Sequence, residues 1–216
     1  MTNDRQLQRD VEQELAWEPS INAEQIGVSV KDGVVELDGH VGSYYEKQAA
    51  ERAALRIANV KAIASEIRVE LPFSAVRTNE DIARAAKNQL EWNISIPTSV
   101  KVKVDDGWVT LQGNVDWQYQ KQEAERCVRP LLGVRGVTNK ITLQPKVLAG
   151  DVKNKIEEAL KRNAQVDADH IAVTTSDGVV TLSGRVKTWA ERRAAENATF
   201  AAPGVTKVNN RIQIGD

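Results

Sequence analysis

A nine-residue pattern occurs three times in the chain and constrains its fold more than any other feature. The pattern is G-x-V-x-L-x-G-x-V, and its copies begin at Gly33, Gly107 and Gly178, which are 74 and then 71 positions apart. Apolar residues at every second position indicate a strand with one buried face. Recurrence at a nearly constant spacing indicates internal repeats, so the chain is predicted to fold as three copies of one unit.

Each copy of the pattern lies in similar surroundings. An Asp-Gly pair joins it to a preceding alternating run, and this arrangement predicts a hairpin, because Gly adopts the positive φ of a type I′ turn freely and Asp tolerates it. Further upstream, apolar residues at i, i+4 and i+8 predict an amphipathic helix. The predicted buried stripes of these helices are Leu7, Val11 and Leu15, then Ile82, Ala86 and Leu90, then Val152, Ile156 and Leu160. Downstream, an Ala-rich segment predicts a second helix, and a last strand follows.

These elements predict an α+β fold with the order helix, strand, strand, helix, strand in each unit. Two helices are expected to cover one face of a three-stranded mixed sheet. The predicted repeats are residues 1–72, 77–145 and 147–216, and Pro and Gly break the patterns between them. Units of about 70 residues bury only a small core, so we expect the repeats to pack against one another. A structural role is predicted for the motif glycines Gly33, Gly39, Gly107, Gly113, Gly178 and Gly184.

The order of these elements, with Gly-Val before a last strand such as "GVTNKI", resembles the BON domain family of bacterial osmotic-stress and nodulation proteins. Three tandem copies cover almost the whole chain. The first copy departs from the pattern, with Asn59 in place of the Gly and Ser65 in place of the usual Asn. The resemblance implies a non-enzymatic binding module. It also implies osmotic-stress induction, an envelope or periplasmic setting, binding to phospholipid surfaces, and in some members a transport-associated role.

The residues themselves offer no catalytic or metal-ligating constellation. His40 and His170 occupy unrelated places in their repeats, and the only cysteine, Cys127, aligns with alanines and is predicted to fill a small core position. The repeated glycines lack the Lys-Ser or Lys-Thr of a phosphate loop, and "KVDDGW" lacks the further acids of a calcium loop. We therefore expect no enzyme activity, no cofactor and no metal.

Nucleic acid is a weaker candidate partner than its one motif suggests. Gly133 and Gly136 form a G-x-x-G, the loop with which KH domains clamp RNA, but here it leads into a strand rather than joining two helices. The other two copies lack it. With 29 basic and 30 acidic side chains, the chain has a net charge of -1, which argues against attraction to a polyanion.

Charge and aromatic residues are distributed unevenly among the repeats. Residues 1–74 carry a net charge of -5, residues 75–146 carry +3, and residues 147–216 carry +1. Trp or Tyr beside Lys or Arg is typical of a membrane interface. The candidate lipid- or partner-binding residues are Arg84, Lys87, Trp92, Trp117, Tyr119, Lys121, Trp189, Arg192 and Arg193. The same aromatic rings could instead cap the core or fill a seam between repeats.

Two functions remain open at this point. One is docking on anionic phospholipid or an envelope partner, chiefly through the second and third repeats. The other is a soluble stress-response scaffold that binds proteins or a small ion or metabolite. The start "MTNDRQLQRDVEQEL" has no secretory signal, and no run reaches the ~18 apolar residues of a membrane span. These observations favour a cytoplasmic location with peripheral membrane contact; the family implies the periplasm as an alternative.

Overall fold

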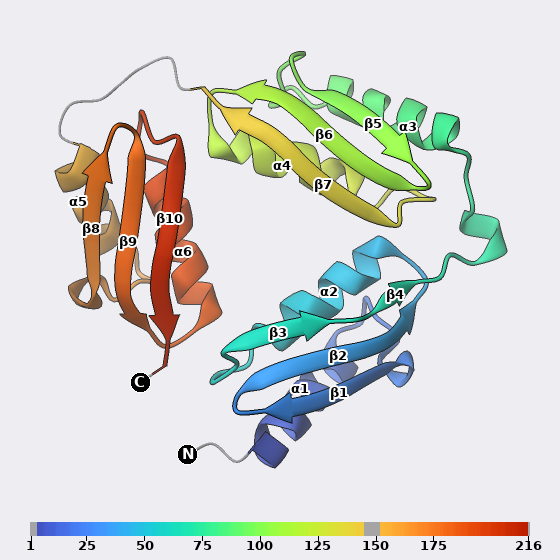
Figure 1. The fold of residues 1–216 in the computed structure, drawn as a ribbon, viewed down its shortest axis with the longest axis horizontal. Helices are drawn as coiled ribbons and strands as arrows, with labels where there is room; N and C mark the ends of the chain where they lie inside the picture. Colours follow the sequence, from blue (N-terminus) through green and yellow to red (C-terminus); the bar gives the residue numbers. More distant parts are fainter. Residues whose placement is uncertain (1–3, 145–151, 216) are drawn as a thin grey trace.

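The computed structural model describes residues 4–144 and 152–215, and over these ranges the chain folds three times into the predicted order of elements (Figure 1). The predicted boundary between the second and third repeats lies outside the described residues. The elements of repeat 1 are α1 (Asp4–Trp17), β1 (Ile26–Lys31), β2 (Val34–Val41), α2 (Tyr44–Ala54), β3 (Ala62–Ser65) and β4 (Arg68–Val69). Those of repeat 2 are α3 (Asn79–Trp92), β5 (Lys101–Asp105), β6 (Trp108–Val115), α4 (Gln118–Val128) and β7 (Gly136–Leu143). Those of repeat 3 are α5 (Val152–Arg162), β8 (Ile171–Ser176), β9 (Val179–Val186), α6 (Trp189–Phe200) and β10 (Lys207–Ile214).

Each repeat contains the predicted mixed sheet with both helices on one face (Figure 1). The first two strands pair antiparallel and the last strand pairs parallel to the middle one. Short 3₁₀ turns at Ala23–Gln25, Phe73–Ala75 and Ala168–His170 complete the connections. The parallel pairing requires the helical crossover that the second helix of each repeat provides.

The Asp-Gly pairs form the predicted hairpin turns. Asp32 and Gly33 have φ values of 53° and 80°, and the corresponding pairs in repeats 2 and 3 also have positive φ at both positions. Positive φ at both central residues is the signature of a type I′ turn, whose twist matches that of the flanking strands. The repeated Asp-Gly is therefore a structural corner.

The second glycine of each motif allows a close backbone approach. Gly113 has a φ of 131°, and a Cβ at this position would lie 2.4 Å from the carbonyl oxygen of Ser99. Gly39 and Gly184 are in the same situation, with a carbonyl oxygen 2.1 Å and 2.0 Å away. No side chain fits there, so the fold explains all three glycines without a ligand.

The predicted apolar stripes form three separate cores. Leu15, Leu90 and Leu160 are almost completely buried at equivalent places in the first helices, and Ala50, Ala124 and Ala195 are fully buried in the second helices. The small alanine side chains let each second helix approach its sheet closely. Each repeat thus buries its own core of Val, Ile, Leu and Ala.

The last strand of repeat 1 is interrupted, unlike its counterparts. In repeat 2, the side chain of Asn139 donates from Nδ2 to the carbonyl oxygen of Lys121 in α4 and accepts from the backbone N–H of Ile141. Asn210 makes equivalent strand and helix contacts in repeat 3. Repeat 1 has Ser65 at this position, and its buried hydroxyl has no hydrogen-bond partner. The shorter side chain does not reach the helix, and β3 ends at this residue.

The three repeats are arranged around a common centre (Figure 1). In each repeat, the second helix and the last strand lie toward this centre, while the first helix and first strand lie on the outside. The second helices α2, α4 and α6 therefore provide the inner surfaces at which repeats meet. The repeats meet through a few contacts, described below, whereas the extensive packing of helices and strands lies within each repeat.

Candidate binding surfaces

Trp189 lies in the seam between repeats 1 and 3. It is the first residue of α6, and its indole Nε1–H donates to the carbonyl oxygen of Val60, at 2.8 Å. The guanidinium of Arg192 stacks over the ring, 4.8 Å from its centroid. The indole edge thus bonds to repeat 1, while Arg192 of the same helix covers its face. A ring that fills a seam between repeats was the alternative role left open by the sequence.

The equivalent position in repeat 1 makes an equivalent contact. Tyr44 is the first residue of α2 and packs against the core of repeat 2, where its surroundings include Arg129, Glu125 and the Val137 backbone. Burial raises the pKa of the Tyr44 hydroxyl above its ordinary value. The second helix of repeat 1 thus contacts repeat 2, as that of repeat 3 contacts repeat 1.

The remaining pair of repeats is joined by a polar contact. Gln122 of α4 donates from Nε2 to Oδ1 of Asn197 in α6, at 3.2 Å on an exposed surface. Repeat 1 therefore contacts repeat 2, repeat 2 contacts repeat 3, and repeat 3 contacts repeat 1. The three contacts close a ring within one chain.

The two arginines after Trp189 have different surroundings. Arg192 donates from Nη2 to the carbonyl oxygen of Asn210, at 2.9 Å, so it ties α6 to β10 as well as covering the indole. Arg193 is exposed, and among the described residues no carboxylate pairs with it. Of this predicted cluster, only Arg193 has a guanidinium available to a ligand.

The predicted residues of α3 are exposed, and their cations are paired. Arg84 contacts Glu80 at 2.6 Å, and Lys87 contacts Glu91 at 3.6 Å. Trp92, the last residue of α3, is 89% exposed. A fully solvated indole at a helix end has no role in the core, which makes Trp92 the strongest single candidate for contact with a partner.

The structure brings the end of α3 together with the start of α4. The side chain of Asn93 donates from Nδ2 to Oε1 of Glu123, at 2.9 Å, and both helix ends lie at the same end of the repeat 2 sheet (Figure 1). Trp117 and Tyr119, in the first turn of α4, are 38% and 56% exposed. Lys121 follows one turn later and is half-buried. Four of the candidate residues, Trp92, Trp117, Tyr119 and Lys121, thus occupy one end of repeat 2, away from the Trp189 seam.

A groove that the sequence did not reveal adjoins Trp92. It lies between α3 and the edge strand β5 and has a volume of about 450 Å³. Its apolar lining is Leu90, Ile96, Pro97 and Val100, and its charged lining is Lys87, Glu91 and Lys101. Ile94, two residues after Trp92, is fully exposed. The "WNISIP" stretch could have signalled this feature, because it places three large apolar residues just after an amphipathic helix. We use the name repeat 2 end face for Lys87, Trp92, Ile94, Lys101, Trp117 and Tyr119.

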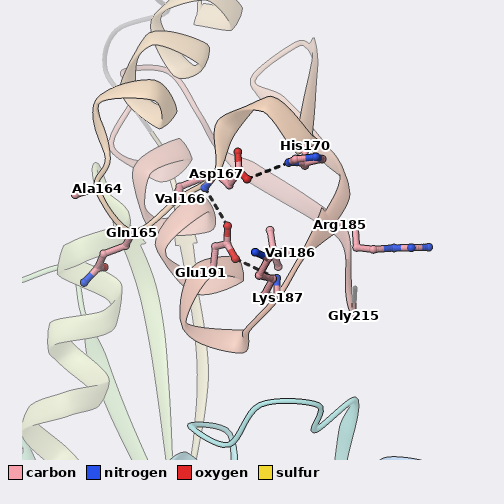
Figure 2. Close-up of a pocket in the computed structure, with 10 residues that line it drawn as sticks. All are labelled: Ala164, Gln165, Val166, Asp167, His170, Arg185, Val186, Lys187, Glu191 and Gly215. Carbon is pink, nitrogen blue, oxygen red and sulfur yellow. Dashed lines mark hydrogen bonds and ion pairs between the residues drawn. The ribbon is translucent and has the colours of Figure 1, made fainter. Parts of the chain in front are cut away.

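A second pocket lies at the corresponding end of repeat 3 (Figure 2). Its central carboxylate, Glu191, accepts from the backbone N–H of Asp167 at 2.9 Å and from that of Lys187 at 3.0 Å. Glu46 bridges two backbone N–H groups in the same way in repeat 1. His170 contacts Asp167 at 3.1 Å on the rim. Glu191 therefore has a structural role, because it links the backbone at Asp167 to the backbone at Lys187.

A comparison with known families identifies the repeats. A family model described as "BON domain" matches residues 3–70, 78–145 and 149–216. The chain belongs to the BON domain family. Each match covers one of the three structural repeats, so the fold and the family agree.

One curated relative of this BON protein is "Osmotically-inducible protein Y" of Escherichia coli (strain K12). It is 35% identical over 124 residues, which are 54% of this chain and 62% of the relative. This chain therefore covers less than two thirds of the relative's length. Among solved structures, one match is the C-terminal domain of CdsD, a structural protein of the type III secretion system of Chlamydia trachomatis. It is 14% identical, with a TM-score of 0.28, and the match covers 99% of this chain and 100% of that chain. The PrgH periplasmic domain is 13% identical with a TM-score of 0.23, over 89% and 96% of the two chains. TM-scores this low do not establish a shared overall arrangement.

The remaining motif residues of the BON protein have packing roles. A Cβ at Gly136 would lie 2.5 Å from the ring of Trp108, and one at Gly133 would lie 2.8 Å from the side chain of Ile82. Close packing therefore accounts for both glycines of the G-x-x-G. Cys127 packs against the repeat 2 core as predicted, and burial raises the pKa of its thiol to about 11.

Two searches of the described residues gave negative results. No group of three or more His, Cys, Asp or Glu side chains within residues 4–144 and 152–215 could hold a metal ion. In the same ranges, no helix combines the length and the apolar character needed to cross a membrane.

Proposed function

We propose that this BON protein is a stress-related, non-enzymatic binding protein that docks on anionic phospholipid surfaces through the repeat 2 end face. The stress role follows its similarity to an osmotically-inducible protein and its three BON repeats. The observation that carries the docking proposal is the exposure of Trp92 and Ile94, at 89% and 101%, beside a groove lined by Lys87 and Lys101.

The chemistry of this face suits the boundary between headgroups and acyl chains. Indole and aliphatic side chains gain free energy when they leave water for this boundary, and nearby ammonium groups are attracted to anionic headgroups. Trp117 and Tyr119 extend the same face with two more partly exposed rings. Repeat 2 also carries the largest net positive charge of the three repeats, +3.

The chain provides a matched control for the decisive residue. Trp17 is the last residue of α1, as Trp92 is the last residue of α3, and Trp17 is 83% exposed. It belongs to the repeat with a net charge of -5. The two tryptophans thus share a structural position and a high exposure but belong to repeats of opposite net charge.

Cosedimentation with phosphatidylglycerol and phosphatidylcholine vesicles tests the proposal. We expect binding to phosphatidylglycerol that weakens as salt is raised, because counterions screen exposed charges beyond about 10 Å at 0.1 M. Trp92→Ala should weaken this binding about tenfold, the equivalent of ~1.4 kcal/mol, which is a fraction of the area term for one exposed indole. Trp17→Ala should leave it within about twofold.

Separate variants test the electrostatic part. Lys101→Gln should remove roughly 1 kcal/mol of binding and reduce the salt dependence. Lys87→Gln should have a smaller effect, because Glu91 already pairs with Lys87. Equal binding to both lipids, or equal effects of the Trp17 and Trp92 substitutions, would contradict the proposal.

A further inference from the structure

A small, open cavity lies at the seam between repeats 1 and 3. Its volume is about 270 Å³, and it is lined by the end of α2, the turn after it, Gln165 and α6. Trp189 forms part of its lining while its Nε1–H bonds to Val60 across the seam. Residues of both repeats therefore line the cavity, beside the hydrogen bond from Trp189 to Val60.

The lining of this cavity is strongly basic. Arg52 contributes from α2, Arg56 from the turn after it and Arg193 from α6, whereas no acidic side chain lines it. Arg56 is partly neutralised from outside the cavity, since it contacts Glu14 at 2.6 Å and Glu18 at 2.9 Å. These ion pairs also fix the direction of its guanidinium.

The other two arginines lack such neutralisation. Arg52 lies over the ring of Tyr45, 5.9 Å from its centroid, and among the described residues no carboxylate pairs with it or with Arg193. Like charges that converge on one cavity repel each other, so an anion between them would lower the electrostatic free energy. Guanidinium groups bind phosphate in particular, because their planar N–H groups match its oxygens in pairs.

The lining combines basic, polar and apolar groups around a volume of about 270 Å³. The amides of Gln165 and Asn197 add polar groups, while Leu55, Ala190 and Ala194 supply apolar surface. We propose that this cavity binds a small, soluble phosphorylated anion, with its phosphate held by Arg52 and Arg193 and its remainder against the apolar wall.

A comparison of the three copies shows that this cluster occurs once. The position of Arg193 is Gln48 in repeat 1 and Gln122 in repeat 2. The position of Arg52 is Arg126 in repeat 2, but there the guanidinium bonds to Glu123. The arginine cluster is therefore not a requirement of the BON fold, which is stable at the other seams without it.

The experiment uses the full chain and the Trp189 indole N–H as the reporter. Its ¹H–¹⁵N cross-peak is assigned by its absence in Trp189→Phe and followed during titration with inorganic phosphate and pyrophosphate. We expect a saturable shift, with pyrophosphate binding more tightly than phosphate. Arg193→Gln should weaken this binding at least about tenfold, because it removes a charge-assisted contact while placing at this position the residue of the other two repeats.

Two further variants keep the result unambiguous. Arg52→Gln should weaken pyrophosphate binding to a similar degree, whereas Arg126→Gln, its counterpart in repeat 2, should leave it within about twofold. The remaining cross-peaks report whether each variant is folded. Absence of a saturable shift with either anion, or equal binding by Arg193→Gln and the unsubstituted chain, would overturn the proposal.

The same variants separate this site from the proposed membrane contact. Arg193→Gln should keep the binding to phosphatidylglycerol vesicles, and Trp92→Ala should keep the binding of pyrophosphate. If Arg193→Gln instead abolished vesicle binding and no soluble anion bound, the arginines would belong to a lipid surface, and the soluble-ligand proposal would be wrong.

Discussion

Replacement of Trp189 tests whether the ring of repeats is closed in solution. Trp189→Phe removes the hydrogen bond to Val60 but keeps an aromatic ring under Arg192, so we expect a loss of about 1 kcal/mol in the free energy of unfolding. Trp189→Ala also removes the contact with Arg192, worth about 0.5–1 kcal/mol. It exposes in addition roughly 100 Å² of apolar seam, worth about 2.5 kcal/mol at ~25 cal/mol per Å². The expected total for alanine is about 4 kcal/mol, an upper value because side chains relax around the gap.

Urea unfolding followed by far-UV circular dichroism measures these losses, and small-angle scattering of the folded chain reports whether the seam opens. The control is Gln118→Ala, because Gln118 is the first residue of α4 as Trp189 is of α6. This surface change should shift the free energy of unfolding by less than about 0.5 kcal/mol. If Trp189→Ala and Gln118→Ala had the same effect and the scattering of both matched the unsubstituted chain, the seam would not be a stabilising contact and the closed ring would be wrong.

Other consequences of the structure are testable in single variants. Gly113→Ala should lower stability by more than about 2 kcal/mol, because its φ of 131° and the oxygen 2.4 Å from the new Cβ both oppose a side chain; calorimetry would detect this, and an unchanged melting temperature would contradict it. Glu191→Ala should lower the free energy of unfolding by about 2 kcal/mol, because it leaves two backbone N–H groups without their acceptor. Glu191→Gln should cost less than about 1 kcal/mol, since Gln120 occupies the equivalent position in repeat 2. Equal melting temperatures for the two variants would refute this role. Burial raises the pKa of the Cys127 thiol from 9.0 to about 11, and only the thiolate reacts with iodoacetamide. At pH 8 the thiol should therefore react roughly 100-fold more slowly in the folded chain than in urea. Equal rates would show that the thiol is not buried.

The repeat could be predicted from sequence because its signals are local. Asp32 and Gly33 specify the turn through their own backbone preferences, and alternating Val35 and Leu37 specify which face of the strand is buried. Both pieces of information lie within a few residues of each other. The same is true of the i, i+4, i+8 stripes, which determine the buried face of each first helix without reference to the rest of the chain.

The binding surfaces could be predicted only in part, because they depend on contacts between distant segments. Trp189 and Arg193 were grouped by sequence proximity, and both line the seam cavity, but Val60, the partner of Trp189, lies 129 positions away. Arg52 and Arg56 carried no local signal of a shared site with Arg193. The available hint was positional: two of the three residues that begin the second helices are aromatic, Tyr44 and Trp189.

The differences among copies separate what folds the protein from what it binds. Positions that face a core stay apolar in every copy, either as the same residue, as with Leu15, Leu90 and Leu160, or as different ones, as with Val11, Ala86 and Ile156. Two residues after these leucines, Trp17, Trp92 and Arg162 end the helix, and nothing in the packing of a single repeat requires any of them. The first residues of the second helices also differ, and two of them serve contacts between repeats: Tyr44 packs against repeat 2, and Trp189 bonds to repeat 1. In a chain of three similar units, one fold therefore supports three seams and three end faces, and only the surfaces at which the copies differ can distinguish one partner from another.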